Sequence, residues 1–175
     1  MLLEFCSMTE NEMYRMVHDI YMEGNVENAR WRNPGLTDLT EAIKEEEMGF
    51  VEFLKSFLAK DENRYYVLEI DGQWVSALRL TMIDDFYYLE ALETAEEHRK
   101  QGHAALLIRE VVDLLKQRGQ VIIRDNVSKR NLPSIATHKK CGFLIEEENG
   151  IDFLSGERSD RVYGMMLWEC HRPGQ

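Results

Sequence analysis

The segment Glu93–Leu115, ETAEEHRKQGHAALLIREVVDLL, joins the end of a predicted strand to a predicted helix through a short polar loop. Apolar residues recur at the spacing of one buried helix face: Ala104, Leu107, Ile108, Val111 and Leu115. Backbone N–H groups in the first turn of a helix have no acceptor inside it, and the helix dipole adds partial positive charge there. The segment therefore favours a phosphate or pyrophosphate ligand at the start of this helix.

Small and basic residues lie where such a ligand would sit. The pattern is Arg99-x-x-Gly102-x-Ala104. Glycine and alanine let a phosphate approach the backbone closely, and Arg99 and Lys100 add positive charge. By itself the pattern is also compatible with an ordinary helix that begins at a glycine and carries basic residues facing solvent.

The residues before this segment predict two helices and four strands. A short apolar strand at 2–6 precedes a helix that begins with the capping box Thr9 and Glu12 and ends at Gly24. We expect a loop at 24–37 and a second helix at 38–60. The strands 65–70, 74–83 and 86–94 follow, separated by the turns Asp71-Gly72 and Asp84-Asp85.

After the helix that opens at Gly102 and ends at Gly119, the pattern predicts a strand at 121–127 and a short helix at 131–141. The last strands are expected at 143–147 and 162–169. The order β-α-α-β-β-β-α-β-α-β-β predicts a mixed α+β fold with helices packed on a sheet.

The composition suits one soluble domain spanning residues 1–175. The net charge of −11 argues against a nucleic-acid groove and permits a cationic ligand, although acidity can also serve only solubility. The three cysteines, Cys6, Cys141 and Cys170, are too few and too far apart for a disulfide framework or a metal site. The chain has no apolar run of membrane-spanning length and no leader-like start, so we expect a cytoplasmic protein with no membrane partner.

A second motif follows in the order that a known family would have it. It reads Val127-x-x-x-Asn131-x-x-Ser134-x-x-x-His138-x-x-x-Gly142-Phe143. Together with the strand–loop–helix segment it resembles the GNAT acetyltransferase superfamily, whose pattern carries Tyr at the position of His138. The resemblance covers residues 65–147 well, whereas the first sixty residues match only in the order of elements.

The resemblance implies a GNAT fold of α+β type, with α/β/α layers and a mixed, mostly antiparallel sheet. That sheet should splay open between the strands at 86–94 and 121–127, and acetyl-CoA should enter the gap as co-substrate, without a metal. The residues expected to bind it are Leu92 and Thr94 for the pantetheine and acetyl carbonyl, Arg99, Lys100, Gln101, Gly102, His103 and Ala104 for the pyrophosphate, and Asn131 and Ser134 for the pantetheine arm. Asn131 is also expected to cap the following helix.

The implied chemistry is direct transfer of an acetyl group to an amine, which needs a base, an oxyanion donor and an acid. Simple strand alternation places Tyr88, Glu90, Leu92 and Thr94 on one face, which favours Glu90 as base, with Glu93 as second choice. Thr94 N–H is the candidate oxyanion donor. His138 is either the acid for the leaving thiolate or a packed helix residue, in which case water or the acceptor supplies that proton.

The acceptor site is expected around the loop at 24–37, the start of the second helix, the last two strands and the loop at 148–161. Tyr21, Trp31 and Tyr163 are the aromatic candidates, and the acceptor can be a small cationic amine or a protein amine. Two other functions stay open: a non-catalytic acyl-CoA-binding sensor, and an unrelated α+β domain for another phosphate ligand. The strand at 162–169, with Tyr163 and Trp168, fits either a homodimer seam or a buried strand.

Overall fold

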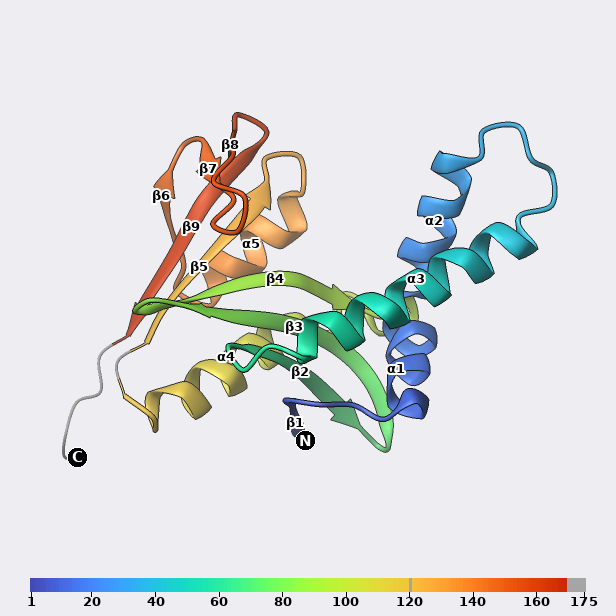
Figure 1. The fold of residues 1–175 in the computed structure, drawn as a ribbon. Coiled ribbons are helices and arrows are strands. Elements are labelled where there is room, and N and C mark those ends of the chain that lie inside the picture. Colours follow the sequence, from blue (N-terminus) through green and yellow to red (C-terminus); the bar gives the residue numbers. More distant parts are fainter. Residues whose placement is uncertain (120, 170–175) are drawn as a thin grey trace.

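The computed structural model describes residues 1–119 and 121–169 and forms three layers (Figure 1). A seven-stranded sheet with the order β1-β2-β3-β4-β5-β9-β6 lies between helices on both faces. Its pairings are antiparallel except for β4 with β5, which is parallel. The predicted mixed, mostly antiparallel α+β fold is confirmed.

The N-terminal helical region is longer than the sequence suggested. Helix α1 (Glu10–Met16) begins at the predicted capping box, in which Thr9 accepts from the Glu12 N–H and the Glu12 carboxylate accepts from the Thr9 N–H. It continues through the π-helix η1 (Val17–Tyr21) into α2 (Met22–Arg32). The predicted stop at Gly24 is therefore wrong, and of the loop predicted at 24–37 only the part after Arg32 lies outside a helix.

Tertiary packing explains this difference. A glycine inside a helix costs only about 1 kcal/mol relative to alanine. Here the helix continues because Asn25 and Ala29, on the following turns, are buried. Helix α2 then packs along α3 (Thr40–Leu58) as a helical hairpin, and its connecting loop projects away from the sheet (Figure 1).

The first half of the sheet has nearly the predicted bounds. Its strands are β1 (Leu2–Phe5), β2 (Asn63–Ile70), β3 (Gln73–Ile83) and β4 (Phe86–Thr94). Helices α1 and α3 cover one face of this half, where the buried residues include Met16, Leu54, Tyr65 and Val67.

The second half begins with the 3₁₀ turn η2 (Glu96–His98) and α4 (His103–Lys116). It continues with β5 (Val121–Ser128), α5 (Leu132–Lys140), β6 (Leu144–Glu147), the small hairpin of β7 (Gly150–Ile151) and β8 (Arg158–Ser159), and β9 (Val162–Glu169). The larger core lies beneath α4 and α5; it includes Leu107, Ile108, Ile123, Phe143 and Leu167.

Strands β4 and β5 pair over only three residues. The pairs are Tyr87 with Ile123, Tyr88 with Arg124, and Leu89 with Asp125. Beyond Leu89, β4 runs on to Thr94 beside β3 alone, and β5, β9 and β6 diverge from it (Figure 1). The predicted splay of the sheet is confirmed, and we call the space between the two separated strands the gap.

Candidate functional site

The loop before α4 presents a row of unbonded amides. Lys100 and Gly102 have positive φ angles of 61° and 85°, and glycine at the second position adopts this conformation without strain. Within residues 1–119 and 121–169, no protein acceptor contacts the N–H groups from Lys100 to Ala104. Such alternation of backbone conformation before a helix makes an anion-binding concavity. This loop therefore has the geometry of an anion site, and the phosphate site stays a prediction.

Arg99 does not extend that site with its side chain. Its Nε donates to the Thr94 carbonyl at 3.0 Å, and its Nη2 contacts the carboxylates of Glu93, at 3.0 Å, and Glu23 on α2. Its own N–H donates to Glu96 O at 3.3 Å. The expectation that Arg99 adds charge for a phosphate is corrected, because the guanidinium is already engaged by two carboxylates.

A β-bulge in β4 changes which side chains face which way. Arg79 on β3 lies opposite Glu90, but Ala77 lies opposite Glu93, so two residues of β4 face one residue of β3. Ala91 takes a φ of 52° at this point. A bulge adds one residue to a strand and shifts the alternation after it. Glu90 and Glu93 consequently share a face, whereas Thr94 lies on the opposite one, contrary to the alternation we expected.

The two candidate bases have different partners on that shared face. Glu90 makes a bidentate ion pair with Arg79, at 3.1 and 3.3 Å, and both side chains are 18% exposed. The Arg79 guanidinium in turn stacks over the ring of Phe53 on α3. Glu93 is more exposed and contacts Arg99.

Side chains cover several backbone groups along the gap. The Glu93 carboxylate accepts from the Thr94 N–H at 3.1 Å, so the candidate oxyanion donor is occupied by the neighbouring side chain. The Tyr21 hydroxyl donates to Ala91 O at 2.7 Å, which fixes the carbonyl of the bulge. Burial raises the pKa of Tyr21 well above its ordinary value, so this hydroxyl stays protonated and able to donate.

On the other side of the gap, α5 begins as predicted. The Asn131 side chain accepts from Ser134 N at 3.1 Å and so caps the helix, with Pro133 in the first turn. Its amide nitrogen has no hydrogen-bond partner among the described residues and could still meet a ligand. Leu92, on the facing strand, is half-buried against the larger core.

His138 is 1% exposed and engaged at both ring nitrogens. Nδ1 lies 2.8 Å from Ser134 O. Nε2 lies 2.7 Å from Oδ2 of Asp125, but this oxygen lies off the axis of the ring N–H. The contact with Asp125 is therefore an ion pair rather than a linear hydrogen bond. The ring also packs edge-on against Phe143. These contacts fit the second of its two expected roles, a packed residue, better than that of an acid.

Burial alone would lower the pKa of His138. The close contact with the charged Asp125 carboxylate, together with the hydrogen bond to the Ser134 carbonyl, outweighs burial and leaves the pKa above its ordinary value. Asp125 was not singled out from the sequence, because nothing local links a strand residue to a helix side chain thirteen positions later. Glu23 and Arg79 were not singled out from the sequence either, because their partners, Arg99 and Glu90, lie on other elements.

The aromatic residues expected around the acceptor do not gather in one place. Tyr21 lies at the bulge, but Trp31 is 81% exposed at the far end of α2, on the projecting hairpin (Figure 1). Tyr163 packs on the face that α4 and α5 cover. Trp168 remains exposed on β9, so the homodimer seam stays a prediction.

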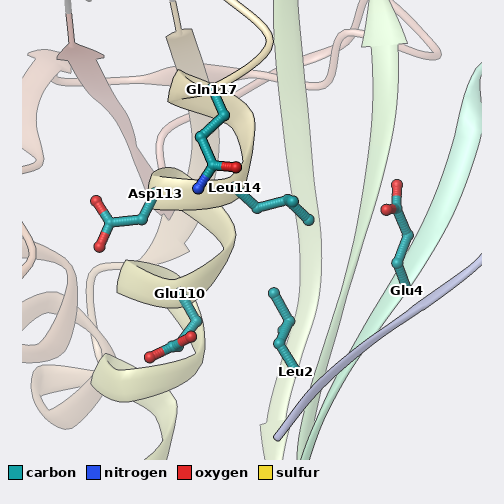
Figure 2. A pocket seen from close by; sticks show the side chains of 6 residues that line it. All are labelled: Leu2, Glu4, Glu110, Asp113, Leu114 and Gln117. Carbon is teal, nitrogen blue, oxygen red and sulfur yellow. The ribbon is translucent and has the colours of Figure 1, made fainter.

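Two surface cavities lie outside the gap. One, of about 360 Å³, separates β1 from α4, where Leu2 and Leu114 approach each other and Glu110 and Asp113 point outward (Figure 2). The other, of about 450 Å³, lies between α2 and η2 and is lined by five carboxylates: Asp19, Glu23, Glu27, Glu96 and Glu97. Its charge attracts cations.

Within the described part of the chain, no group of His, Cys, Asp and Glu side chains could hold a metal ion. Nor is any helix among these residues long and apolar enough to cross a membrane. Cys6 and Cys141 are free thiols, and Cys170 lies outside the described residues.

Comparisons with known proteins agree with this geometry. The sequence model of the acetyltransferase (GNAT) family matches residues 24–143. A search of curated proteins finds no match. Many solved structures share the fold, among them the PaiA N-acetyltransferase of Thermoplasma acidophilum in complex with coenzyme A. It is 15% identical, with a TM-score of 0.64 over 97% of this chain and 99% of that one.

Two other similar structures carry different acceptors in their names. The ribosomal-protein-S18-alanine N-acetyltransferase of Escherichia coli is 16% identical, with a TM-score of 0.61 over 100% of this chain and 97% of that one. A chimera of the Vibrio cholerae spermidine N-acetyltransferase SpeG with hSSAT is 18% identical, with a TM-score of 0.63 over 95% of each chain. At these identities the likeness shows the fold alone.

The buried pair predicts a pH-dependent stability. Because the folded-state pKa of His138 is raised, its contribution is complete below its unfolded pKa of about 6.5 and is lost as pH rises through the folded value. Asp125→Asn should cost about 3 kcal/mol at pH 6 and less at pH 9, measured by urea unfolding. The control is His18→Gln, at an exposed histidine. A cost that is the same at both pH values would contradict the charged pair.

Proposed function

Because the chain belongs to the acetyltransferase (GNAT) family, we propose that it is an acetyl-CoA-dependent N-acetyltransferase that moves an acetyl group directly to a primary amine. One observation carries the proposal: the unbonded amides from Lys100 to Ala104 lie beside a strand edge that β5 has left. An anion site next to an open strand edge suits a ligand with a diphosphate and a long amide-bearing arm.

The cofactor would be held mainly by backbone. Lys100, Gln101, Gly102, His103 and Ala104 offer N–H groups to the pyrophosphate, and the positive end of α4 supports its charge. Leu92 would offer polar backbone groups of the unpaired strand to the pantetheine amides, Thr94 would do so once Glu93 has left its N–H, and Asn131 and Ser134 would contact the pantetheine arm from α5. When bound, acetyl-CoA supplies an activated acetyl thioester. A crystal structure of the similar PaiA N-acetyltransferase was determined with coenzyme A.

Thr94 N–H can serve as oxyanion donor only after Glu93 has left it, since that carboxylate accepts its hydrogen in this structure. The oxyanion role of Thr94 therefore requires Glu93 to turn away when the thioester arm binds. Glu90 faces the same side as Glu93 and lies nearer to the point where β4 and β5 part. We keep Glu90 as the base and Glu93 as second choice.

The acceptor is an amine whose identity stays open. The similar structures include proteins named for spermidine and for a ribosomal-protein alanine, so the fold serves both small-molecule and protein amines. Several carboxylates around the gap and the net charge of −11 would attract a cation.

The decisive assay is release of free thiol from acetyl-CoA over a panel of amines: polyamines, aminoglycosides, lysine peptides and peptides with a free N-terminus. We expect one class to raise thiol release well above hydrolysis, with the acetylated amine seen by mass spectrometry. Calorimetry with acetyl-CoA runs in parallel. Binding without transfer to any amine would favour the acyl-CoA sensor, and absence of binding would overturn the assignment.

The role of the unbonded N–H groups from Lys100 to Ala104 can be tested by a substitution at Gly102. Gly102→Ala places a side chain at φ 85°, which costs about 1 kcal/mol and shifts the loop, so acetyl-CoA should bind about tenfold more weakly by calorimetry. Gly35→Ala is a matched control, because Gly35 also has a positive φ, of 99°, with free space for a Cβ, but lies in the α2–α3 loop. Equal affinity of both variants for acetyl-CoA would contradict the site.

The roles of Glu90 and Glu93 can be separated by replacing each carboxylate with the amide of the same shape. Glu90→Gln should lower kcat by about 100-fold or more with little change in acetyl-CoA affinity, because a base is lost. Glu93→Gln should weaken the hydrogen bond from Thr94 N–H to residue 93 and tighten acetyl-CoA binding, with kcat changed by less than about threefold. The opposite pattern, with kcat lost in Glu93→Gln, would identify Glu93 as the base.

A further inference from the structure

A single ion pair joins helix α5 to the sheet. Within residues 1–119 and 121–169, the contact of His138 Nε2 with Asp125 Oδ2, at 2.7 Å, is the only hydrogen bond or ion pair between a residue of α5 and a strand. The other end of the helix is tied to α4, where Arg109 donates to Lys140 O at 3.4 Å. The position of α5 on β5 therefore depends on apolar packing and on this one pair.

The pair lies at the level where the sheet parts. Asp125 belongs to the last pair between β4 and β5, and β5 then continues to Ser128, about 10 Å further along the gap. The chain turns there, and α5 runs back along β5. From Asn131 to His138 the helix rises about 10 Å. Because the two lengths match, the first turn of α5 lies beside the separated part of β5, and His138 lies where that part begins.

Both ring nitrogens of His138 carry a hydrogen. Nδ1 lies 2.8 Å from Ser134 O, and a carbonyl only accepts, so Nδ1 is the donor; the Ser134 hydroxyl is more distant, at 3.4 Å. Nε2 faces a carboxylate oxygen of Asp125, and a lone pair at Nε2 would be repelled by it. The acceptors around the ring thus require an imidazolium next to a carboxylate.

No second charge is available to either partner. His138 and Asp125 are both buried, and Asp125 is the only charged group among the described residues that shifts the pKa of His138. The remaining neighbour of the ring is the apolar side chain of Phe143, and α4 and β9 contribute apolar residues to the same core. The Cys141 thiol contacts Ala105 O on α4 instead.

Given the proposed acetyl-CoA site, on which this inference rests, we propose that Asp125 and His138 are positioning residues. Their ion pair holds the first turn of α5 in place for the pantetheine arm, and loss of the His138 proton weakens acetyl-CoA binding. The pair acts through the helix, since Ser134 O is fixed by the ring and Ser134 N donates to the Asn131 side chain at 3.1 Å.

The direction of the pH effect follows from the charges. The pKa of His138 is raised by Asp125, so the ion pair is complete below that pKa and is lost as pH rises through it. Asp125 is then a buried carboxylate without a cation, which is costly, and α5 loses its polar contact with the sheet. Because coupling is reciprocal, a ligand that needs the pair in turn raises the pKa of His138.

The first test uses wild-type protein and two ligands. Desulpho-coenzyme A keeps the arm and cannot react, and 3′-phosphoadenosine 5′-diphosphate keeps the diphosphate and lacks the arm. Imidazole NMR gives the pKa of His138, which should be higher with desulpho-coenzyme A bound. By calorimetry on both sides of that pKa, the preference for the ligand with the arm should fall by about three- to tenfold at the higher pH. Titration of the phosphates, or of His98 and His103, affects both ligands alike.

The second test removes the charges. His138→Gln should weaken desulpho-coenzyme A by about tenfold at pH 6.5 and the ligand without the arm by less than about twofold. The double variant Asp125→Asn/His138→Gln replaces the ion pair with two amides that can hydrogen-bond without an added proton. Its affinity for desulpho-coenzyme A should return to within about threefold of wild type, with a preference that no longer changes with pH. His18→Gln, at an exposed histidine, is the control that keeps the wild-type pH dependence.

The outcomes separate this inference from the proposed function. Wild-type protein that binds desulpho-coenzyme A with a preference constant over pH, and with an unchanged pKa of His138, overturns the positioning role alone. So does an equal loss of both ligands in His138→Gln, or a pH-dependent preference that survives in the double variant. If His138→Gln does not fold, the wild-type protein and the double variant decide the question. Failure of the wild-type protein to bind desulpho-coenzyme A overturns the proposed function itself.

Discussion

The separation of β4 from β5 after Leu89 and Asp125 sets the conditions for the rest of the site. A strand edge leaves polar backbone groups that need partners. The chain meets this need with side chains: Tyr21 reaches Ala91 O, Glu93 reaches Thr94 N, and Arg99 reaches Thr94 O. These backbone groups of the edge are therefore bonded to side chains rather than to a neighbouring strand.

The charges around this edge are paired although the chain is strongly acidic. Arg79 binds Glu90 in a largely buried contact, and Arg99 holds Glu23 and Glu93 together. Such pairs fix geometry more than they add stability, since desolvation offsets much of the attraction. Net charge thus describes how the protein attracts cations from a distance, whereas the site depends on these individual partners.

The sequence predicted the parts of this fold that depend on local signals. The Asp71-Gly72 turn, the capping box at Thr9 and the glycine before α4 each act within a few residues, and each appears as expected. The splay came from the family resemblance, which local patterns could not provide. A local signal also failed at Gly24, where packing against α3 kept the helix going.

The sequence could not predict the bulge at Ala91, because alanine rarely adopts a positive φ and nothing nearby marks the position. Its effect is large, since it moves Glu93 to the face of Glu90 and Thr94 to the other. The partners of His138 and Arg99 come from distant elements and likewise carry no local signal.

The Glu93 carboxylate competes with any ligand for the Thr94 N–H, because it accepts that hydrogen in this structure. A ligand that needs this N–H meets it only in the fraction of molecules in which the carboxylate has swung aside, so its apparent affinity is the intrinsic affinity scaled by that fraction. Weaker apparent binding raises the ligand concentration at which half of the molecules are occupied, and the strength of one internal hydrogen bond sets the size of that shift.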